Sequence, residues 1–73
     1  MARAIVICEI NGSVWKIQIK EGDTVSEEDT LAILESMKME IPVLAPSGGT
    51  VERILVAEGD AVAEGQYLMV ISE

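Results

Sequence analysis

An internal repeat is the feature that most constrains the fold of this chain. Shifting the sequence by 37 residues aligns it with itself, so the first copy comprises residues 1–36 and the second residues 38–73, with Met37 between them. The matching segments include Gly12-Ser13-Val14 with Gly49-Thr50-Val51, and Glu21-Gly22-Asp23 with Glu58-Gly59-Asp60. Units this short cannot each close a core of their own. The repeat therefore predicts one domain over residues 1–73, organised about a pseudo-two-fold axis.

Each copy has the pattern of short β-strands separated by turns, and no stretch of useful length has helical periodicity. The strands expected in the first copy are residues 3–9, 14–19, a short stretch at Val25, and 30–35; those in the second are 40–45, 51–56, a short stretch at Val62, and 67–72. In the second strand Val14, Lys16 and Gln18 alternate with Trp15, Ile17 and Ile19. The sequence therefore predicts an all-β domain, a small sandwich or barrel.

Turn-forming residues separate these strands. Glycine in each Glu-Gly-Asp segment supplies a positive φ at low cost, and the aspartate is expected to bond to the backbone that follows it. Ser26 and the three acidic residues after it, Glu27 to Asp29, resemble a helix start, but the strand pattern that resumes at Thr30 favours a solvated turn. Pro42 has no amide proton to donate within a sheet, so its nitrogen must point away from a neighbouring strand or the strand must bend.

The junction between the copies is the position that the symmetry singles out. It is the counterpart of the two termini, so residues 36–39 are expected to form an exposed hairpin at the opposite end of the molecule. Lys38 then lies at the tip. Met37-Lys38 lacks the Asn-Gly chemistry that favours such a turn. This mismatch suggests that the two residues are kept for a reason other than folding.

The residues around this junction carry a resemblance to a known family. The segment from Ile33 to Pro42 reads Ile-Leu-Glu-Ser-Met-Lys-Met-Glu-Ile-Pro, and the repeat, the Glu-Gly-Asp turns and the Ala-Pro-Ser-Gly-Gly turn at 45–49 surround it. The chain resembles the biotinyl/lipoyl attachment domain family, specifically its biotinyl branch, over essentially its whole length. The resemblance implies a flattened barrel of two four-stranded sheets, the barrel-sandwich hybrid, with Lys38 as the residue that carries covalent biotin.

The same resemblance implies a carrier that is a substrate of other proteins and not itself an enzyme. A biotin protein ligase would attach the cofactor to Lys38. A biotin carboxylase and a carboxyltransferase, bound in trans, would then load and unload a carboxyl group. Met37 and Met39 are expected to be exposed and to serve recognition by the ligase or carboxylase, and Glu35, Ser36 and Glu40 are candidates for ligase recognition.

Two other interpretations remain open. Ser36 replaces the usual alanine of the biotinyl motif and is slightly lipoyl-like, so a lipoyl ligase could attach lipoate to Lys38 in place of biotin or in addition to it. The protein would then serve a 2-oxo acid dehydrogenase or a glycine cleavage-type complex. The other interpretation, of a different class, is an unmodified interaction module that docks through its tip.

Composition narrows the remaining function classes. The net charge of −8 disfavours nucleic acid and anionic membrane surfaces. Histidine is absent and Cys8 is the one cysteine, so neither histidine-based nucleophilic catalysis nor an ordinary zinc site is expected. Cys8 is expected to be a small apolar filler, and Trp15 to be partly exposed without a ligand role. The apolar stretch at 4–8 is too short for a signal peptide, so we expect a cytoplasmic protein. We also expect a monomer.

Overall fold

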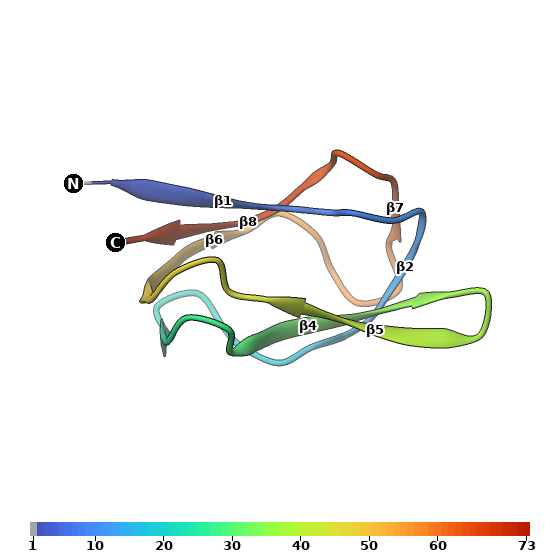
Figure 1. The fold of residues 1–73 in the computed structure, drawn as a ribbon, viewed down its shortest axis with the longest axis horizontal. Coiled ribbons are helices and arrows are strands. Elements are labelled where there is room, and N and C mark those ends of the chain that lie inside the picture. Colours follow the sequence, from blue (N-terminus) through green and yellow to red (C-terminus); the bar gives the residue numbers. More distant parts are fainter. Residues whose placement is uncertain (1) are drawn as a thin grey trace.

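The computed structural model describes residues 2–73 and shows eight β-strands in chain order (Figure 1). No helix, and hence no helix able to cross a membrane, occurs within these residues. The strands are β1 (Arg3–Ile7), β2 (Gly12–Ile17), β3 (Thr24–Val25), β4 (Thr30–Ser36), β5 (Met39–Leu44), β6 (Gly49–Ile54), β7 (Ala61–Val62) and β8 (Tyr67–Ser72). Every predicted strand is present, with boundaries that shift by up to two residues.

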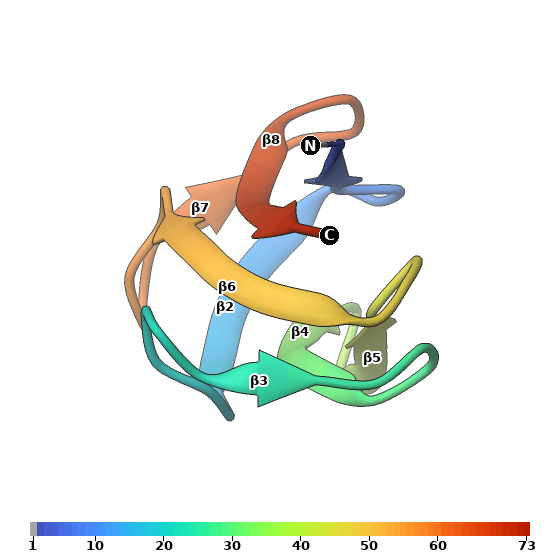
Figure 2. The same ribbon diagram turned by 90° about the vertical axis from the view of Figure 1, so that its left-hand side faces the viewer.

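The two copies of the repeat exchange strands between two four-stranded antiparallel sheets. One sheet has the order β1-β8-β6-β3 and the other the order β5-β4-β2-β7. Replacing each strand by its equivalent 37 residues away converts one order into the other. Each sheet therefore takes two strands from each copy, and neither copy can form a sheet of this kind alone. Figure 2 shows the two layers seen from the end of the molecule, and this confirms the sandwich-like barrel.

A β-bulge corrects one detail of the predicted pattern. The pairing of β2 with β4 shifts register between Val14 and Lys16, and that of β6 with β8 shifts at the equivalent place, between Val51 and Arg53. The extra residue reverses the alternation, because two consecutive side chains then face outward. Val14 is buried in the core, whereas Trp15 and Lys16 are both exposed. Lys16 therefore lies on the opposite face of the strand from Val14, although strict alternation would place the two on the same face. The strict alternation expected through residues 14–19 is wrong at this point.

Each Glu-Gly-Asp turn is closed by a hydrogen bond to its own aspartate. Gly22 and Gly59 have φ values of 95° and 93°, as predicted for turn glycines. The Asp23 carboxylate accepts a hydrogen bond from the Lys20 amide, three residues earlier, at 2.9 Å. Asp60 does the same with the Ala57 amide at 2.9 Å. The expected bond to the backbone that follows is therefore replaced by one to the preceding backbone, which closes the turn on itself.

The core lies between the sheets and is wholly apolar among the buried residues. Its members come from both copies: Val6, Cys8, Val14, Val25, Leu31, Ala32, Leu34, Ala45, Val51, Val62, Leu68, Met69 and Ile71. Cys8 is 1% exposed, which agrees with its predicted filler role, and its thiol donates to the Ile10 carbonyl oxygen at 2.9 Å. Residues 26–29 form a turn, as expected, and Pro42 lies in β5, an edge strand that has no neighbour on its outer side.

The termini and the β4–β5 hairpin lie at opposite ends of the longest axis (Figure 1). The molecule measures 37 × 19 × 18 Å. At each end a glycine lets two strands approach closely, because a Cβ on Gly12 would collide with the Glu35 carbonyl oxygen and one on Gly49 with that of Ser72. The prediction that the repeat junction lies opposite the termini is confirmed.

Candidate functional site

The candidate site is the two-residue loop that joins β4 to β5. The last residue pair of the hairpin is Ser36 with Met39, so Met37 and Lys38 form the whole loop. Both have positive φ, 52° and 66°. Two-residue loops of this kind match the twist of the flanking strands, but they favour asparagine and glycine because other side chains are strained there. The barrel therefore imposes on Met37 and Lys38 a conformation that their own preferences oppose.

The side chains at the tip are open to solvent. Met37 is 92% exposed and Met39 is 63% exposed, whereas Met69 is fully buried in the core. Lys38 lies between the two exposed methionines and is exposed as well. Large apolar side chains with this exposure contribute little to the core of a small domain. Their exposure is as expected for a hairpin at the repeat junction, and exposed apolar side chains of this size suit contact with a second protein.

Carboxylates flank the tip without binding its lysine. Glu35 and Glu40 are paired directly across the hairpin, one residue pair below Ser36 and Met39. The ion pair formed within residues 2–73 joins Arg3 to Glu52 at 3.0 Å, so the Lys38 ammonium is not held by either glutamate. Within the described residues, the Lys38 side chain is therefore exposed and forms no ion pair.

Ser36 faces the body of the domain and not the solvent beyond the tip. Its hydroxyl donates a hydrogen bond to the Asn11 carbonyl oxygen at 2.9 Å, and the residue is half-buried. The Asn11 side chain in turn accepts a hydrogen bond from the Glu64 amide, also at 2.9 Å. The sequence pattern assigned Asn11 no part in the site. Only contacts between residues distant in sequence reveal that part.

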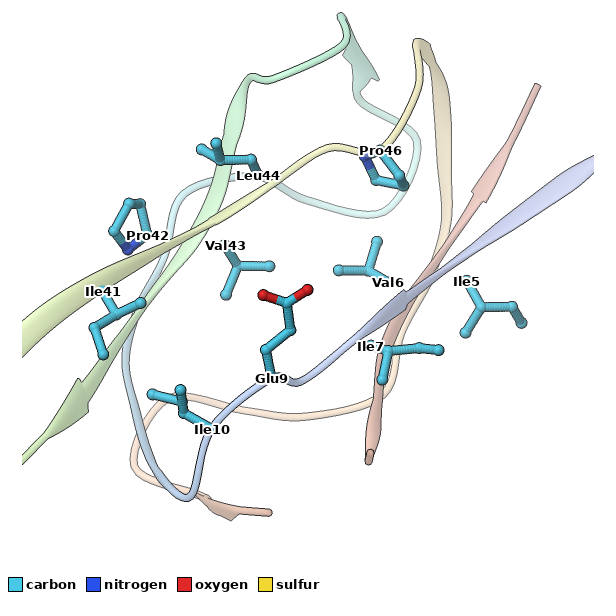
Figure 3. Close-up of a pocket in the computed structure, with 10 residues that line it drawn as sticks. All are labelled: Ile5, Val6, Ile7, Glu9, Ile10, Ile41, Pro42, Val43, Leu44 and Pro46. Carbon is cyan, nitrogen blue, oxygen red and sulfur yellow. The ribbon is translucent and has the colours of Figure 1, made fainter. Parts of the chain in front are cut away.

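A groove runs along the open side of the barrel, between the edge strands β1 and β5. It has a volume of about 530 Å³, and Figure 3 shows the Glu9 carboxylate pointing into a space otherwise lined by apolar side chains. Its walls are related by the repeat, since Ile7 and Leu44 are equivalent positions with 48% and 47% exposure. The groove lies along the side of the barrel, and no sequence pattern indicated it.

The chemistry that this surface can perform by itself is limited. No group of three or more side chains suited to holding a metal ion occurs in the part of the chain that the structure describes. Within residues 2–73 the structure shows no ion pair between Lys38 and either of the two carboxylates, Glu35 and Glu40, that are paired below the tip. Fold and site together define a class of protein: a small internally duplicated β-domain that presents one lysine on a strained hairpin, at the end opposite its termini.

The chain belongs to the biotin/lipoyl family: the family model described as "Biotin-requiring enzyme" matches residues 4–71. A biotinylated protein TB7.3 homolog of Mycobacterium leprae is 46% identical over 92% of this chain and 94% of its own length. The biotin/lipoyl attachment protein of Bacillus subtilis is 46% identical over 60% of this chain, and the match spans 60% of that protein.

The fold also matches a domain of much larger solved structures. The Kluyveromyces lactis urea carboxylase superposes with a TM-score of 0.92 and 35% identity over 99% of this chain, which corresponds to 6% of that protein. A single-chain, multi-domain long-chain acyl-CoA carboxylase gives a TM-score of 0.89 with 28% identity. These matches confirm the expected family and the two-sheet fold.

Proposed function

We propose that this protein is a biotin carrier in which biotin is attached by an amide bond to Lys38. The observation that carries the proposal is the placement of Lys38 on an exposed two-residue turn, between two exposed methionines and opposite the termini. Relatives named as biotinylated proteins and as a biotin carboxyl carrier protein support it. The chain acts as a substrate and carrier, and the chemistry is supplied by other proteins.

The attachment step needs an activating partner. The ordinary pKa of lysine is near 10.4, so an unassisted amine is largely protonated and unreactive at neutral pH. A biotin protein ligase would supply biotin as an acyl-adenylate. The Lys38 nitrogen attacks the acyl carbon, the bond to the adenylate oxygen breaks, AMP leaves, and the amine loses its proton. The tip contributes an accessible amine, and the ligase contributes the activated acyl group and the base.

The attached cofactor would act as a mobile arm on a rigid support. Lysine extended by the valeryl chain of biotin reaches about 12–15 Å, given ordinary bond lengths. Such an arm lets the ring enter an active site while the barrel stays outside it. A biotin carboxylase would load a carboxyl group on the ring, and a carboxyltransferase would remove it, both as separate proteins bound in trans. The acyl acceptor is set by that transferase.

Biotin is favoured over lipoate by the residues beside Lys38. Met37 and Met39 match the biotinyl motif, and the Ser36 hydroxyl, the one lipoyl-like feature, is turned toward Asn11. The relatives named as biotinylated proteins and as a biotin carboxyl carrier protein support the same choice. A cytoplasmic monomer that meets its ligase and carboxylase transiently fits this role.

Intact mass after coexpression with a biotin protein ligase tests the proposal. One biotinyl increment is expected, and peptide mapping should place it on Lys38. Lys38→Arg should remove the increment, while the matched control Lys20→Arg, at an exposed lysine away from the tip, should keep it. A lipoyl increment with an active lipoyl ligase would transfer the assignment to lipoate. An unmodified mass, with both ligases active on reference domains, would overturn the carrier proposal in favour of an interaction module.

A further inference from the structure

The internal symmetry allows the two ends of the molecule to be compared position by position. Ser36 and Asn11 at the hairpin end correspond to Glu73 and Gly48 at the end that holds the termini. The close approach of strands is common to both ends, because Gly12 packs against Glu35 as its equivalent Gly49 packs against Ser72. Differences between the ends therefore mark what the hairpin end needs beyond the shared fold.

Two side-chain hydrogen bonds distinguish the hairpin end. The Ser36 hydroxyl donates to the Asn11 carbonyl oxygen, and the Asn11 side-chain oxygen accepts from the Glu64 amide, each at 2.9 Å. Gly48 has no side chain with which to form the second bond, and within residues 2–73 the structure shows no side-chain hydrogen bond from Glu73 equivalent to the first. The bonds join the β1–β2 turn, the base of the β4–β5 hairpin and the β7–β8 turn.

The two-residue loop of the β4–β5 hairpin has a strained backbone that its surroundings must hold in place. Met37 follows Ser36 directly, and both Met37 and Lys38 have positive φ. Residues in this conformation persist when their surroundings hold them in place. Ser36 is the last residue of β4, so a bond from its side chain restrains the hairpin at the point where the strained loop begins. Asn11 anchors that restraint to a third segment through Glu64.

We propose that Asn11 and Ser36 are positioning residues that hold the base of the hairpin, so that Lys38 is presented to the biotin protein ligase in one orientation. This inference rests on the proposed attachment of biotin to Lys38. It also changes the expected role of Ser36 from direct ligase recognition to positioning, because its hydroxyl donates to Asn11. A hairpin already held in one orientation loses less conformational entropy when the ligase binds it, so the restraint lowers KM.

The test compares Ser36→Ala and Asn11→Gly, the latter introducing the residue found at the equivalent position of the other copy. Ser26→Ala, which removes an exposed hydroxyl far from the hairpin, is the matched control, and Ser36→Thr retains the donor. Backbone ¹⁵N relaxation should show lower order parameters at residues 37–39 in the first two variants. Ligase kinetics should show KM raised by about 3–10-fold, the effect of one lost hydrogen bond, with kcat within about twofold. Ser36→Thr should have a KM close to that of the unaltered chain.

The outcomes separate this inference from the proposed function. Normal biotinylation of Lys38 with unchanged KM and order parameters in both variants would overturn the positioning role and leave the carrier function standing. A KM increase equal to that of Ser26→Ala would also overturn it. If the unaltered chain takes no biotin at Lys38, the proposed function fails and the inference fails with it. The order parameters still report in that case whether the two residues restrain the hairpin.

Discussion

The amide nitrogen of Ile54 donates a hydrogen bond of 3.0 Å to the carboxylate of Glu21, which belongs to the other copy of the repeat. The equivalent bond runs from the Ile17 amide to Glu58 at 2.9 Å. Each turn glutamate thus satisfies a strand amide of the opposite copy, near the bulge where the sheet ladder is interrupted. These two bonds fasten the copies to each other at equivalent points.

The symmetry predicts equal effects of removing either glutamate. Glu21→Ala and Glu58→Ala should each lower the free energy of unfolding by about 0.5–1.5 kcal/mol, the net worth of one hydrogen bond. Urea denaturation of both variants measures this change. Glu27→Ala removes an exposed carboxylate for which the structure shows no hydrogen bond, and it should change stability by less than about 0.5 kcal/mol. A clear inequality between the two variants would contradict the symmetric fastening.

The core should be equally sensitive at Leu31 and Leu68, which are equivalent positions and essentially unexposed. Truncation of either to alanine should cost about 2–5 kcal/mol, because it leaves a cavity between the sheets. That is a large part of the roughly 4–11 kcal/mol expected for a domain of this size. Leu55→Ala, at a side chain with 47% exposure, is the control and should cost less than about 1 kcal/mol. Thermal unfolding followed by circular dichroism distinguishes the two groups.

Alanine substitution should destabilise the domain at Gly12, where two strands approach closely, and have little effect at Gly48. Gly12→Ala should destabilise the domain by more than about 1 kcal/mol, because the added Cβ meets the Glu35 backbone, which cannot move without disturbing the hairpin. Gly48→Ala has room, with the nearest atom 3.4 Å away and no positive φ. It should change stability by no more than about 0.5 kcal/mol. Comparable denaturation midpoints for the two variants would show that the close approach is unimportant.

A turn-forming residue at position 37 should make the domain more stable and the chain a poorer substrate of the ligase. Met37→Asn should raise the free energy of unfolding by up to about 1 kcal/mol, because asparagine tolerates the positive φ. The same change removes an exposed methionine beside Lys38, so ligase efficiency should fall if that side chain is recognised. Met37→Leu retains the strain and the apolar surface, and is the control for both measurements. An unaltered unfolding curve for Met37→Asn would mean that the loop stores no strain.

The sequence by itself determined the all-β class, the division into two equivalent copies and the position of Lys38 opposite the termini. A repeat offset and strand periodicity depend only on the order of residues, and a two-fold relation between copies places the junction whatever the details of packing. The order of strands in the sheets, the groove between β1 and β5, and the links of Asn11 and Glu21 to distant amides were decided by the tertiary structure. Each of these joins residues from segments far apart in the chain, and local pattern carries no information about such contacts. The tertiary structure also decided the position of the bulge at Trp15. Strand twist and pairing across the sheet decide where an extra residue is accommodated, and the alternation of side chains along one strand does not.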